Sequence, residues 1–253
     1  GHKIKGMVSK KTAPKSYRPV AILPIASKVF EKVIHLPILE HMEANKYWNP
    51  NHHAYRKARN TETALLQMYE SWIEAVATGK VAAACLIDMS AAVDCVDIDI
   101  LLAKCRLYNF SESSVELLES YLRNRKQLVS IGGCNSEPQV LEAGVPQGSI
   151  LGPILYTIYT NDFPEVIHDP DCTEGQEEVE GTIRFKTICS KCGSIVCFAD
   201  DSTFTLITND TNSMSGKLTA NFRKMADYLK EQRLSVNEDK THMLKITTFQ
   251  KKR

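Results

Sequence analysis

The chain has 253 residues, of which 43% are hydrophobic and 24% are charged, and its formal net charge is +1. This composition predicts a soluble, globular protein with one large domain or two lobes. No apolar run approaches the roughly 20 residues that a membrane-spanning helix needs, and no apolar stretch follows the basic N-terminus as it would in a signal peptide.

The net charge conceals a strong asymmetry along the chain. Residues 1–60 hold 12 Lys or Arg and three Asp or Glu, whereas residues 161–180 hold eight Asp or Glu and no Lys or Arg. Lysine and arginine that contact a phosphate backbone release counterions and so favour binding. The basic part therefore predicts a nucleic-acid contact, with a solvated basic tail as the alternative for residues 3–15.

Apolar spacing predicts most of the secondary structure. Residues 26–45 and 61–77 are expected to form helices, the first with a bend at Pro37 and both with one apolar face. The apolar positions of the two helices are Val29, Phe30, Val33, Ile34, Ile38 and Leu39, and Ala64, Leu65, Met68, Trp72 and Val76. The later elements are expected to be strand 81–87, helices 99–107 and 114–125, a β pair from 127–131 and 139–141, helix 149–162 with Ser149 as N-cap, strand 194–199, helix 215–233 and strand 242–248.

Two of the predicted strands end in carboxylates. The apolar run Val81–Ile87 leads into Asp88, and the run Ser194–Ala199 leads into Asp200 and Asp201. Acidic groups at the mouth of buried strands cost desolvation and repel one another unless cations neutralise them. Mg²⁺ prefers oxygen ligands and commonly accompanies phosphate substrates, so the pattern predicts a two-metal phosphoryl- or nucleotidyl-transfer site. The alternative is a tight turn with exposed aspartates.

Eight cysteines are present, most of them single residues in apolar segments, which is typical of reduced thiols in an intracellular protein. The exception is the pair Cys189 and Cys192, with Cys172 and Cys197 nearby in the sequence. Thiolates at this spacing predict a structural Zn²⁺ site, and the alternative is an ordinary hairpin turn.

Five segments occur in an order that resembles a known family. They are SYRPVAILPIASKVFEKVI, HAYRKARNTETALLQ, AGVPQGSILGPILYTIYTNDFP, CFADDSTF and LSVNEDKTHMLKI. Together they resemble the reverse transcriptase domain of non-LTR retrotransposons, in particular the jockey-like group, from about Ser16 to about Ile246. The combination of PQGSxLGP with FADD is specific, unlike a single short motif.

The resemblance implies an α+β fold with the fingers and palm of a right-hand polymerase. The palm is expected to be a ferredoxin-like antiparallel sheet with helices packed on one face, and no thumb is expected in this fragment of a longer polyprotein. Residues 1–80 would form the fingers and 81–253 the palm. Residues 165–193 would form an acidic, cysteine-containing insertion.

The implied activity is RNA-directed DNA synthesis with an RNA template, a DNA primer and dNTPs. By resemblance, Asp88 and Asp200 bridge two Mg²⁺ ions, Asp201 supports the metal near the primer, and the Met89 carbonyl is a further ligand. Mn²⁺ is expected to substitute for Mg²⁺. Lys240 matches a family lysine that protonates pyrophosphate, and the alternative is a surface lysine in a turn.

Other residues are expected to contact substrate. Arg18 would bind the triphosphate, with Arg56 and Arg59 as second choices that could equally contact the template or lie on a solvated face. The turn predicted to approach the template and the templating base pair is formed by Gly144, Pro146, Gln147 and Gly148. The alternative is a structural loop before the next helix.

Val93 departs from the family pattern, which has Phe at this position. In the family this ring collides with a 2′-hydroxyl, so Val93 predicts weaker discrimination between dNTPs and rNTPs. The rival functions are a catalytically silent, decayed copy that still binds nucleic acid and an RNA-dependent RNA polymerase. Endonuclease and thumb domains would lie elsewhere in the polyprotein. Action on chromosomal DNA predicts the nucleus, and assembly with the element's RNA predicts the cytoplasm.

Overall fold

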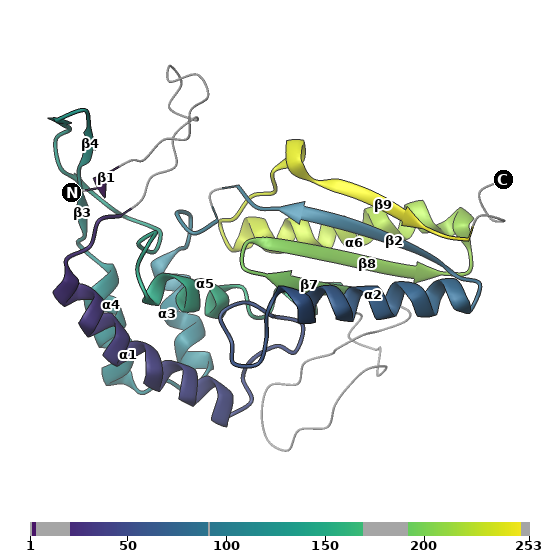
Figure 1. The fold of residues 1–253 in the computed structure, drawn as a ribbon, viewed down its shortest axis with the longest axis horizontal. Helices are drawn as coiled ribbons and strands as arrows, with labels where there is room; N and C mark the ends of the chain where they lie inside the picture. Colours follow the sequence, from purple (N-terminus) through teal and green to yellow (C-terminus); the bar gives the residue numbers. More distant parts are fainter. Residues whose placement is uncertain (1, 4–20, 91, 169–191, 249–253) are drawn as a thin grey trace. The chain divides into compact units, whose positions relative to one another are not determined.

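The computed structural model describes residues 2–3, 21–90, 92–168 and 192–248, which are arranged in two compact units (Figure 1). The first unit comprises Gly1–Asn45 and Val93–Tyr159, and the second comprises Lys46–Ala92 and Thr160–Arg253. Both units are discontinuous in sequence, so compactness does not divide the chain at residue 80. The predicted boundary there separates the fingers from the palm, and it stays a prediction.

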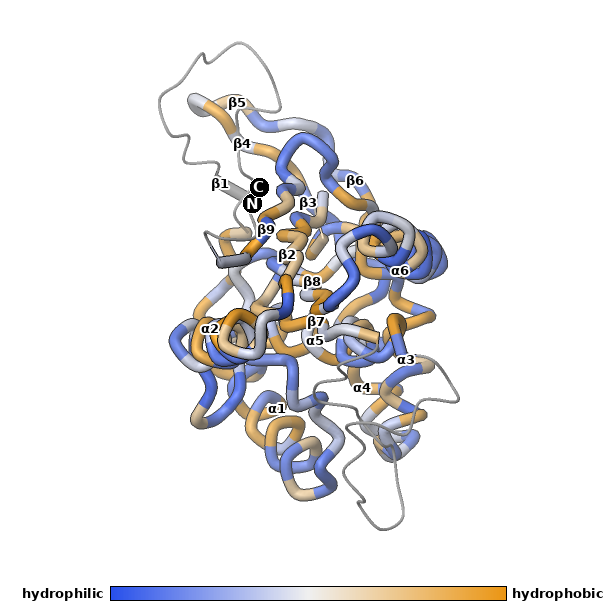
Figure 2. Tube along the Cα trace, turned by 90° about the vertical axis from the view of Figure 1, so that its right-hand side faces the viewer, coloured by the Kyte–Doolittle hydropathy of each residue, from blue (hydrophilic) through white to orange (hydrophobic). Residues whose placement is uncertain are grey.

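The second unit is built on a four-stranded antiparallel sheet. Its order is β7 (Ser194–Phe198), β8 (Asp201–Thr208), β2 (Val81–Asp88) and β9 (His242–Ile246). The three predicted strands of this unit are therefore confirmed, because each lies at its expected place in the chain. Figure 2 shows β2 and β7 as mainly hydrophobic, as expected for the centre of a folded unit.

Helices cover both faces of this sheet. The predicted packing of the palm helices on one face stays a prediction, because residues 61–77 belong to the predicted fingers. Helix α2 (Thr61–Ala77) and helix α6 (Thr211–Glu231) lie on opposite sides of the sheet in Figure 2. The reason lies in β2, where Val81 to Cys85 are all buried. A strand whose side chains are buried on both faces of the sheet has a continuous apolar sequence, and each of these faces must be covered by another element.

Helix α2 has the predicted bounds and most of the predicted buried face, since Ala64 is buried and Met68, Trp72 and Val76 are partly buried. Its buried residues are Ala64, Ser71 and Ala75, while Leu65 is 60% exposed. Small side chains on this face permit a close approach to the sheet, whose central strand β2 carries Ala82, Ala83 and Ala84. The helix begins at Asn60, whose side chain accepts a hydrogen bond from the Thr63 amide (2.9 Å) in a capping box.

The loop 46–60 packs along the edge strand β7. The amide of Cys197 donates to the Asn51 carbonyl, and the His53 amide donates to the Cys197 carbonyl, both at 2.9 Å. His52 is fully buried and contacts the Thr160 hydroxyl at 3.1 Å. Burial, followed by the positive charge of Arg56, lowers the pKa of His52 to about 3, so its ring is neutral at physiological pH.

We expect His52 to make the fold acid-sensitive. Because the unfolded chain binds a proton near pH 6.5 and the folded chain binds it only near pH 3, folding stability is full above pH 6.5 and falls below it. The loss amounts to about 2 kcal/mol between pH 7 and pH 5. Urea unfolding of the parent and of His52→Asn at both pH values checks this, and equal pH dependence of the two proteins would contradict it.

The first unit is mainly helical. Helices α1 (Ile25–Ala44) and α3 (Ile98–Leu107) each contact α5 (Leu151–Tyr159), and α3 also contacts α4 (Glu112–Leu122). Short strands complete it in two small sheets, ordered β1-β4-β5 and β3-β6. Their bounds are β1 His2–Lys3, β3 Lys126–Gln127, β4 Val129–Ile131, β5 Cys134–Asn135 and β6 Gln139–Val140.

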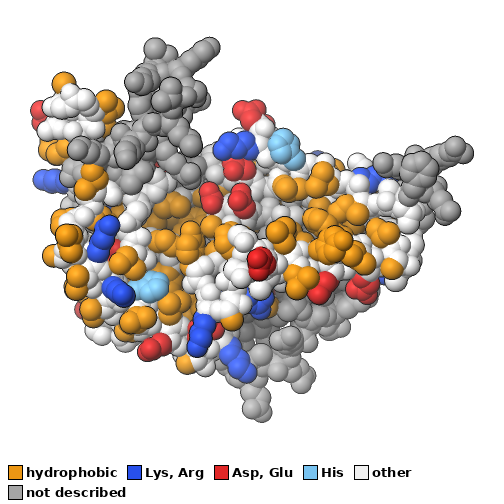
Figure 3. Space-filling model, viewed as in Figure 1, with side chains coloured by type: hydrophobic (Ala, Val, Ile, Leu, Met, Phe, Trp, Pro, Cys, Tyr) orange, Lys and Arg blue, Asp and Glu red, His pale blue; other side chains and the backbone are white. Residues whose placement is uncertain are grey.

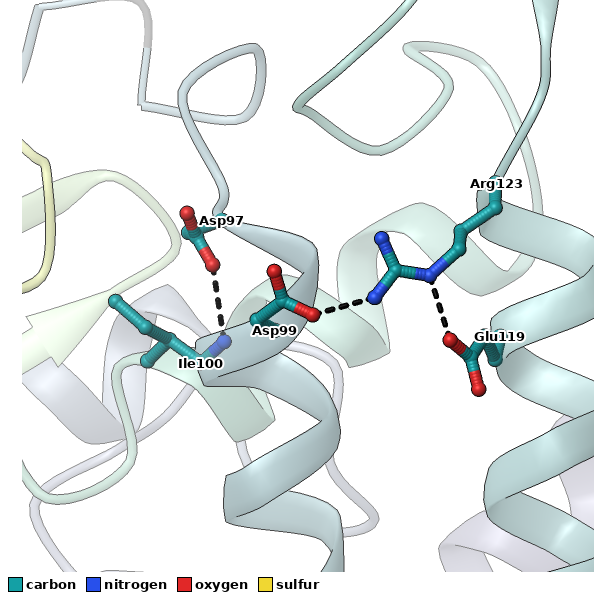
Figure 4. Close-up of polar contacts among 5 residues, drawn as sticks. All are labelled: Asp97, Asp99, Ile100, Glu119 and Arg123. Carbon is teal, nitrogen blue, oxygen red and sulfur yellow. Dashed lines mark hydrogen bonds and ion pairs between the residues drawn. The ribbon is translucent and has the colours of Figure 1, made fainter.

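Polar contacts fix the α3–α4 pair, as Figure 4 shows. The Asp97 carboxylate accepts a hydrogen bond from the Ile100 amide at 3.0 Å and so caps the N-terminus of α3. Arg123 forms ion pairs with Asp99 on α3 and, at 2.6 Å, with Glu119 on α4. These groups lie near the solvent, so their main effect is to set the pairing of two amphipathic helices.

Helix α1 follows the predicted buried face only in its second half, where Ile38 is buried and Ile34 and Leu39 are partly buried. The predicted apolar positions Val29 and Val33 are 60% and 67% exposed, whereas Glu31 is completely buried. The Glu31 carboxylate accepts hydrogen bonds from the amides of Ile150 (2.6 Å) and Leu151 (3.3 Å) at the start of α5. A carboxylate stabilises the positive end of a helix dipole, and here that interaction outweighs the apolar pattern.

The mixed α+β class is confirmed by these elements. Within the described ranges, no helix combines the length and hydrophobicity that crossing a membrane requires.

Candidate active site

The β7–β8 hairpin places two carboxylates at one end of the four-stranded sheet. Phe198 pairs with Asp201, so only Ala199 and Asp200 form the turn. Ala199 has a φ of +55°, in the left-handed region that favours glycine, and such a backbone costs on the order of 1–3 kcal/mol. The strained turn holds Asp200 half-buried beside Asp201.

Asp88 joins the two hairpin carboxylates from the neighbouring strand. As the last residue of β2 it lies directly opposite Asp201 in the β2–β8 register. Burial, and then the negative charges of Asp200 and Asp88, raise the pKa of Asp201, while Lys240 acts in the opposite direction. In Figure 3 acidic side chains gather beside a basic one at this end of the sheet.

Lys240 reaches the carboxylates through a turn that is bonded to the end of β2. The Asn237 amide donates to the Asp88 carbonyl (2.8 Å), and the Ser90 amide donates to the Ser235 carbonyl (2.9 Å). The short 3-10 helix η3 (Glu238–Lys240) follows, and the Lys240 ammonium lies 3.5 Å from the Asp88 carboxylate. All four predicted catalytic residues are thus brought together in the second unit.

The carboxylates fit a divalent cation by the chemistry of their donor atoms. In the described part of the chain no three His, Cys, Asp or Glu side chains are already drawn together at metal-binding spacing. However, Asp88, Asp200 and Asp201 are close enough to repel one another, and one lysine offsets only part of that charge. Hard oxygen ligands with excess negative charge are what Mg²⁺ and Mn²⁺ prefer.

The predicted zinc ligands are only partly described. Cys172 and Cys189 lie outside the described residues, and Cys192 is buried just before β7. Cys197 is buried inside β7, where its sulfur accepts a hydrogen bond from the Ser202 hydroxyl (3.4 Å). Its thiol therefore belongs to the core of the sheet, and the zinc site stays a prediction.

The predicted turn before α5 belongs to the first unit. Gly144 has a φ of +83°, and a side chain there would meet the Asp94 carbonyl oxygen at 2.7 Å. Glycine is thus required by packing inside the unit. The turn is held by Arg125, whose guanidinium donates to the Gly144 carbonyl. Ser149 caps α5 as predicted, since its hydroxyl accepts from the Gly152 amide at 2.8 Å.

Gln147 is the residue of this turn with unused hydrogen-bonding capacity. Its Oε1 atom is buried and has no partner among the described residues. It lines a cavity of about 390 Å³ together with Arg125 and Gly144. A buried acceptor without a partner is costly, which favours a ligand that donates a hydrogen bond to it. Pro146 and Gly148 flank Gln147 in the sequence. The Val93 carbonyl accepts a hydrogen bond from the Val145 amide (3.0 Å), so Val93 is tied to the same turn.

The three candidate arginines differ in their surroundings. Arg18 lies outside the described residues. Arg56 donates through Nη1 to the carbonyls of Asn49 (2.6 Å) and His52 (2.9 Å), so this nitrogen already has a structural function. Arg59 is half-buried, and its positive charge contributes to lowering the pKa of His53. Substrate contacts by these arginines stay predictions.

Local sequence patterns missed two residues that shape these sites. Glu31 anchors the start of α5, and Arg125 holds the Gly144 turn. Both act through contacts that are distant in sequence, so no spacing rule indicates them.

Known proteins are similar to this chain over much of its length. The family model described as reverse transcriptase (RNA-dependent DNA polymerase) matches residues 8–250. The probable RNA-directed DNA polymerase from transposon BS of Drosophila melanogaster is 28% identical over 229 residues, which cover 90% of this chain and 23% of that protein. The RNA-directed DNA polymerase from mobile element jockey of Drosophila funebris is 35% identical over 149 residues, or 59% of this chain and 16% of that protein.

Solved structures show the same fold at low identity. The apo telomerase of Candida tropicalis, truncated from its C-terminal domain, matches with a TM-score of 0.59 and 15% identity, covering 96% of this chain and 50% of that one. A telomerase from the same organism in complex with a TWJ fragment of telomeric RNA has a TM-score of 0.61 at 13% identity, covering 96% and 41%. This chain spans less than a quarter of the length of either curated relative. Because the family model matches nearly every residue, the chain belongs to the reverse transcriptase family, with relatives among the jockey, BS and X-element non-LTR retrotransposons.

Proposed function

We propose that this chain is the catalytic part of an RNA-directed DNA polymerase that extends a DNA primer on an RNA template. The observation that carries the proposal is the meeting of Asp88 and Asp201 across paired strands, with Asp200 in the adjoining turn and Lys240 at 3.5 Å from Asp88. The second unit would contain the palm, and the basic N-terminal residues would belong to the fingers. Because the chain spans less than a quarter of its curated relatives, we propose that thumb and endonuclease functions belong to further domains of a longer polyprotein.

The carboxylates are the residues that would hold Mg²⁺ or Mn²⁺, with the Met89 carbonyl as a further ligand. When bound, the cations would neutralise the negative charge that builds up on the phosphates, and they would activate the primer 3′-hydroxyl. Asp88, Asp200 and Asp201 contribute their negative charge and their fixed positions at the ends of paired strands. Arg18 and Arg59 are proposed to meet the triphosphate, and Gln147 the templating base pair.

Lys240 is proposed to act as the general acid. The primer 3′-hydroxyl attacks the α-phosphate, the bond to the β-phosphate breaks, and pyrophosphate leaves. An ammonium group that is anchored to the end of β2 and 67% exposed is available to donate a proton to the departing oxygen. We place the enzyme in the nucleus when it acts on chromosomal DNA and in the cytoplasm when it assembles with its RNA.

Primer extension tests the proposed function. We expect the chain to add dNTPs to a DNA primer on an RNA template with Mg²⁺ or Mn²⁺, and to stop when EDTA removes the metal. Template binding without extension under either metal would instead identify a catalytically silent copy. Preferential use of rNTPs would identify an RNA polymerase.

The sugar of the incoming nucleotide provides a separate prediction. Val93→Phe is expected to raise the preference for dNTPs over rNTPs by about tenfold or more, because the larger ring excludes a 2′-hydroxyl. The measurement is the ratio of kcat/KM values for dCTP and rCTP on one primer–template. An unchanged ratio in the variant would show that Val93 does not contact the sugar.

A further inference from the structure

One exposed aromatic side chain belongs to a loop that is hydrogen-bonded to the strand leading to Asp200, and it is not used in the proposed chemistry. Tyr55 is 51% exposed, whereas His52, His53 and Ala54 before it are at most 1% exposed. Its φ of +56° lies in the left-handed region, which bulky side chains rarely adopt. Such strain persists only where the surrounding structure enforces it, and it is concentrated at functional sites.

The loop 46–60 holds Tyr55 rigidly on both sides in sequence. Before it, His53 is bonded through its ring to the Thr63 hydroxyl (2.9 Å) and to the Gln67 side chain (2.7 Å). After it, Arg56 donates to two loop carbonyls and lies over the Trp48 ring with its guanidinium carbon 5.5 Å from the ring centre. The ring of Tyr55 is therefore displayed by a preformed support and not by a free loop.

The position of this support relies on β7. The loop is hydrogen-bonded to Cys197, which lies three residues before Asp200 on the same hairpin. A phenol is uncharged at neutral pH. No hydrogen bond ties the Tyr55 hydroxyl to another described residue.

Given the proposed nucleotidyl transfer, on which this inference rests, we propose that Tyr55 is a positioning residue whose ring stacks on a nucleobase at the carboxylate site. An uncharged aromatic ring does not repel the phosphates that must bind nearby. Every base has a π face, so stacking aligns the reacting strand without selecting its sequence. The base belongs either to the primer 3′ end or to the incoming nucleotide.

Kinetics of matched variants test the stacking. Tyr55→Ala is expected to lower kcat/KM for dNTP addition by about 5- to 150-fold, and Tyr55→Phe to stay within about twofold, because only the ring is needed. Tyr69→Ala is the matched control, since Tyr69 is a similarly exposed tyrosine on α2 (56%). Thermal unfolding of each variant separates a loss of stacking from a loss of fold.

Fluorescence of 2-aminopurine identifies which base is stacked. The fluorophore is placed at the primer 3′ end in one experiment and supplied as its deoxynucleoside triphosphate in the other, with Asp200→Asn present throughout to prevent turnover. If the Tyr55→Ala substitution increases 2-aminopurine fluorescence only in the first experiment, Tyr55 stacks on the primer base. If it increases the fluorescence only in the second experiment, Tyr55 stacks on the incoming nucleotide.

The outcomes separate this inference from the proposed function. Normal extension and unchanged fluorescence in Tyr55→Ala would overturn the role of Tyr55 and leave the polymerase intact. Absence of extension by the parent would overturn the polymerase, and the fluorescence of bound primer would still decide whether Tyr55 stacks on a base. A defect in Tyr55→Phe equal to that of Tyr55→Ala would point to the hydroxyl and contradict stacking.

Discussion

Asp200→Asn is expected to abolish primer extension, by about a thousandfold or more, and at the same time to raise the thermal stability of the metal-free protein. The activity falls because a neutral amide replaces a carboxylate of the proposed metal site. The stability rises because Asp200 contributes to the raised pKa of Asp201. A carboxyl whose pKa is higher in the folded state opposes folding once the pH exceeds that value.

The sign of the pH dependence makes this prediction specific. The gain should be full at neutral pH and should disappear as the pH falls below 3.8, where Asp201 becomes protonated in the folded and the unfolded states of both proteins. Added Mg²⁺ should raise the unfolding temperature of the parent more than that of the variant, since binding to the folded state stabilises it. The matched control is Asp227→Asn, at an exposed position on α6.

Differential scanning calorimetry with and without Mg²⁺, together with primer extension, checks both effects. Robust extension by Asp200→Asn would exclude this carboxylate from catalysis. A lower unfolding temperature in the metal-free variant would show that Asp200 supports the hairpin turn more than it repels its neighbours.

Glu31→Ala is expected to destabilise the protein by about 3 kcal/mol, as large an effect as a core truncation. The variant removes the buried acceptor of the Ile150 and Leu151 amides and of the Ser27 hydroxyl (3.0 Å). Hydrogen bonds to a charged group contribute more than neutral ones, and the amides at the start of α5 would be left without a partner. Glu31→Gln keeps one acceptor oxygen and should lose less.

Urea unfolding and hydrogen exchange at the Ile150 and Leu151 amides measure this effect. Glu40→Ala is the matched control, because Glu40 is an exposed glutamate on the same helix. Equal stability of Glu31→Ala and Glu40→Ala would show that water replaces the carboxylate at no cost. Faster exchange at the two amides in Glu31→Ala alone would locate the damage at the start of α5.

Much of the local structure follows from patterns of a few residues. The apolar runs that end at Asp88 and before Asp200 become β2 and β7, because side-chain period and length are local properties. Ser149 caps α5 because its hydroxyl needs only an amide three residues away. Helix α2 has its predicted bounds for the same reason, since its cap and its periodicity lie within the segment.

The choice of buried faces followed only partly from such patterns. On α1 the predicted Ile38 is buried, but Val29 and Val33 are exposed while Glu31 is buried; on α2 the predicted Ala64 is buried, but Leu65 is exposed. Which face a helix buries depends on the element it packs against. Helix α1 packs against the start of α5, whose amides need an acceptor, and α2 packs against a sheet that requires small side chains. The same reason explains why both faces of the sheet are covered.

The sequence by itself therefore determined the family, the strand-end carboxylates and most elements, because each depends on residue types at short spacing. Only the tertiary structure decided that Asp88 faces Asp201 across a strand pair, that Lys240 reaches Asp88, and that the loop carrying Tyr55 is hydrogen-bonded to β7. These contacts join segments more than 100 residues apart in the chain, and strand register and long-range hydrogen bonds create them.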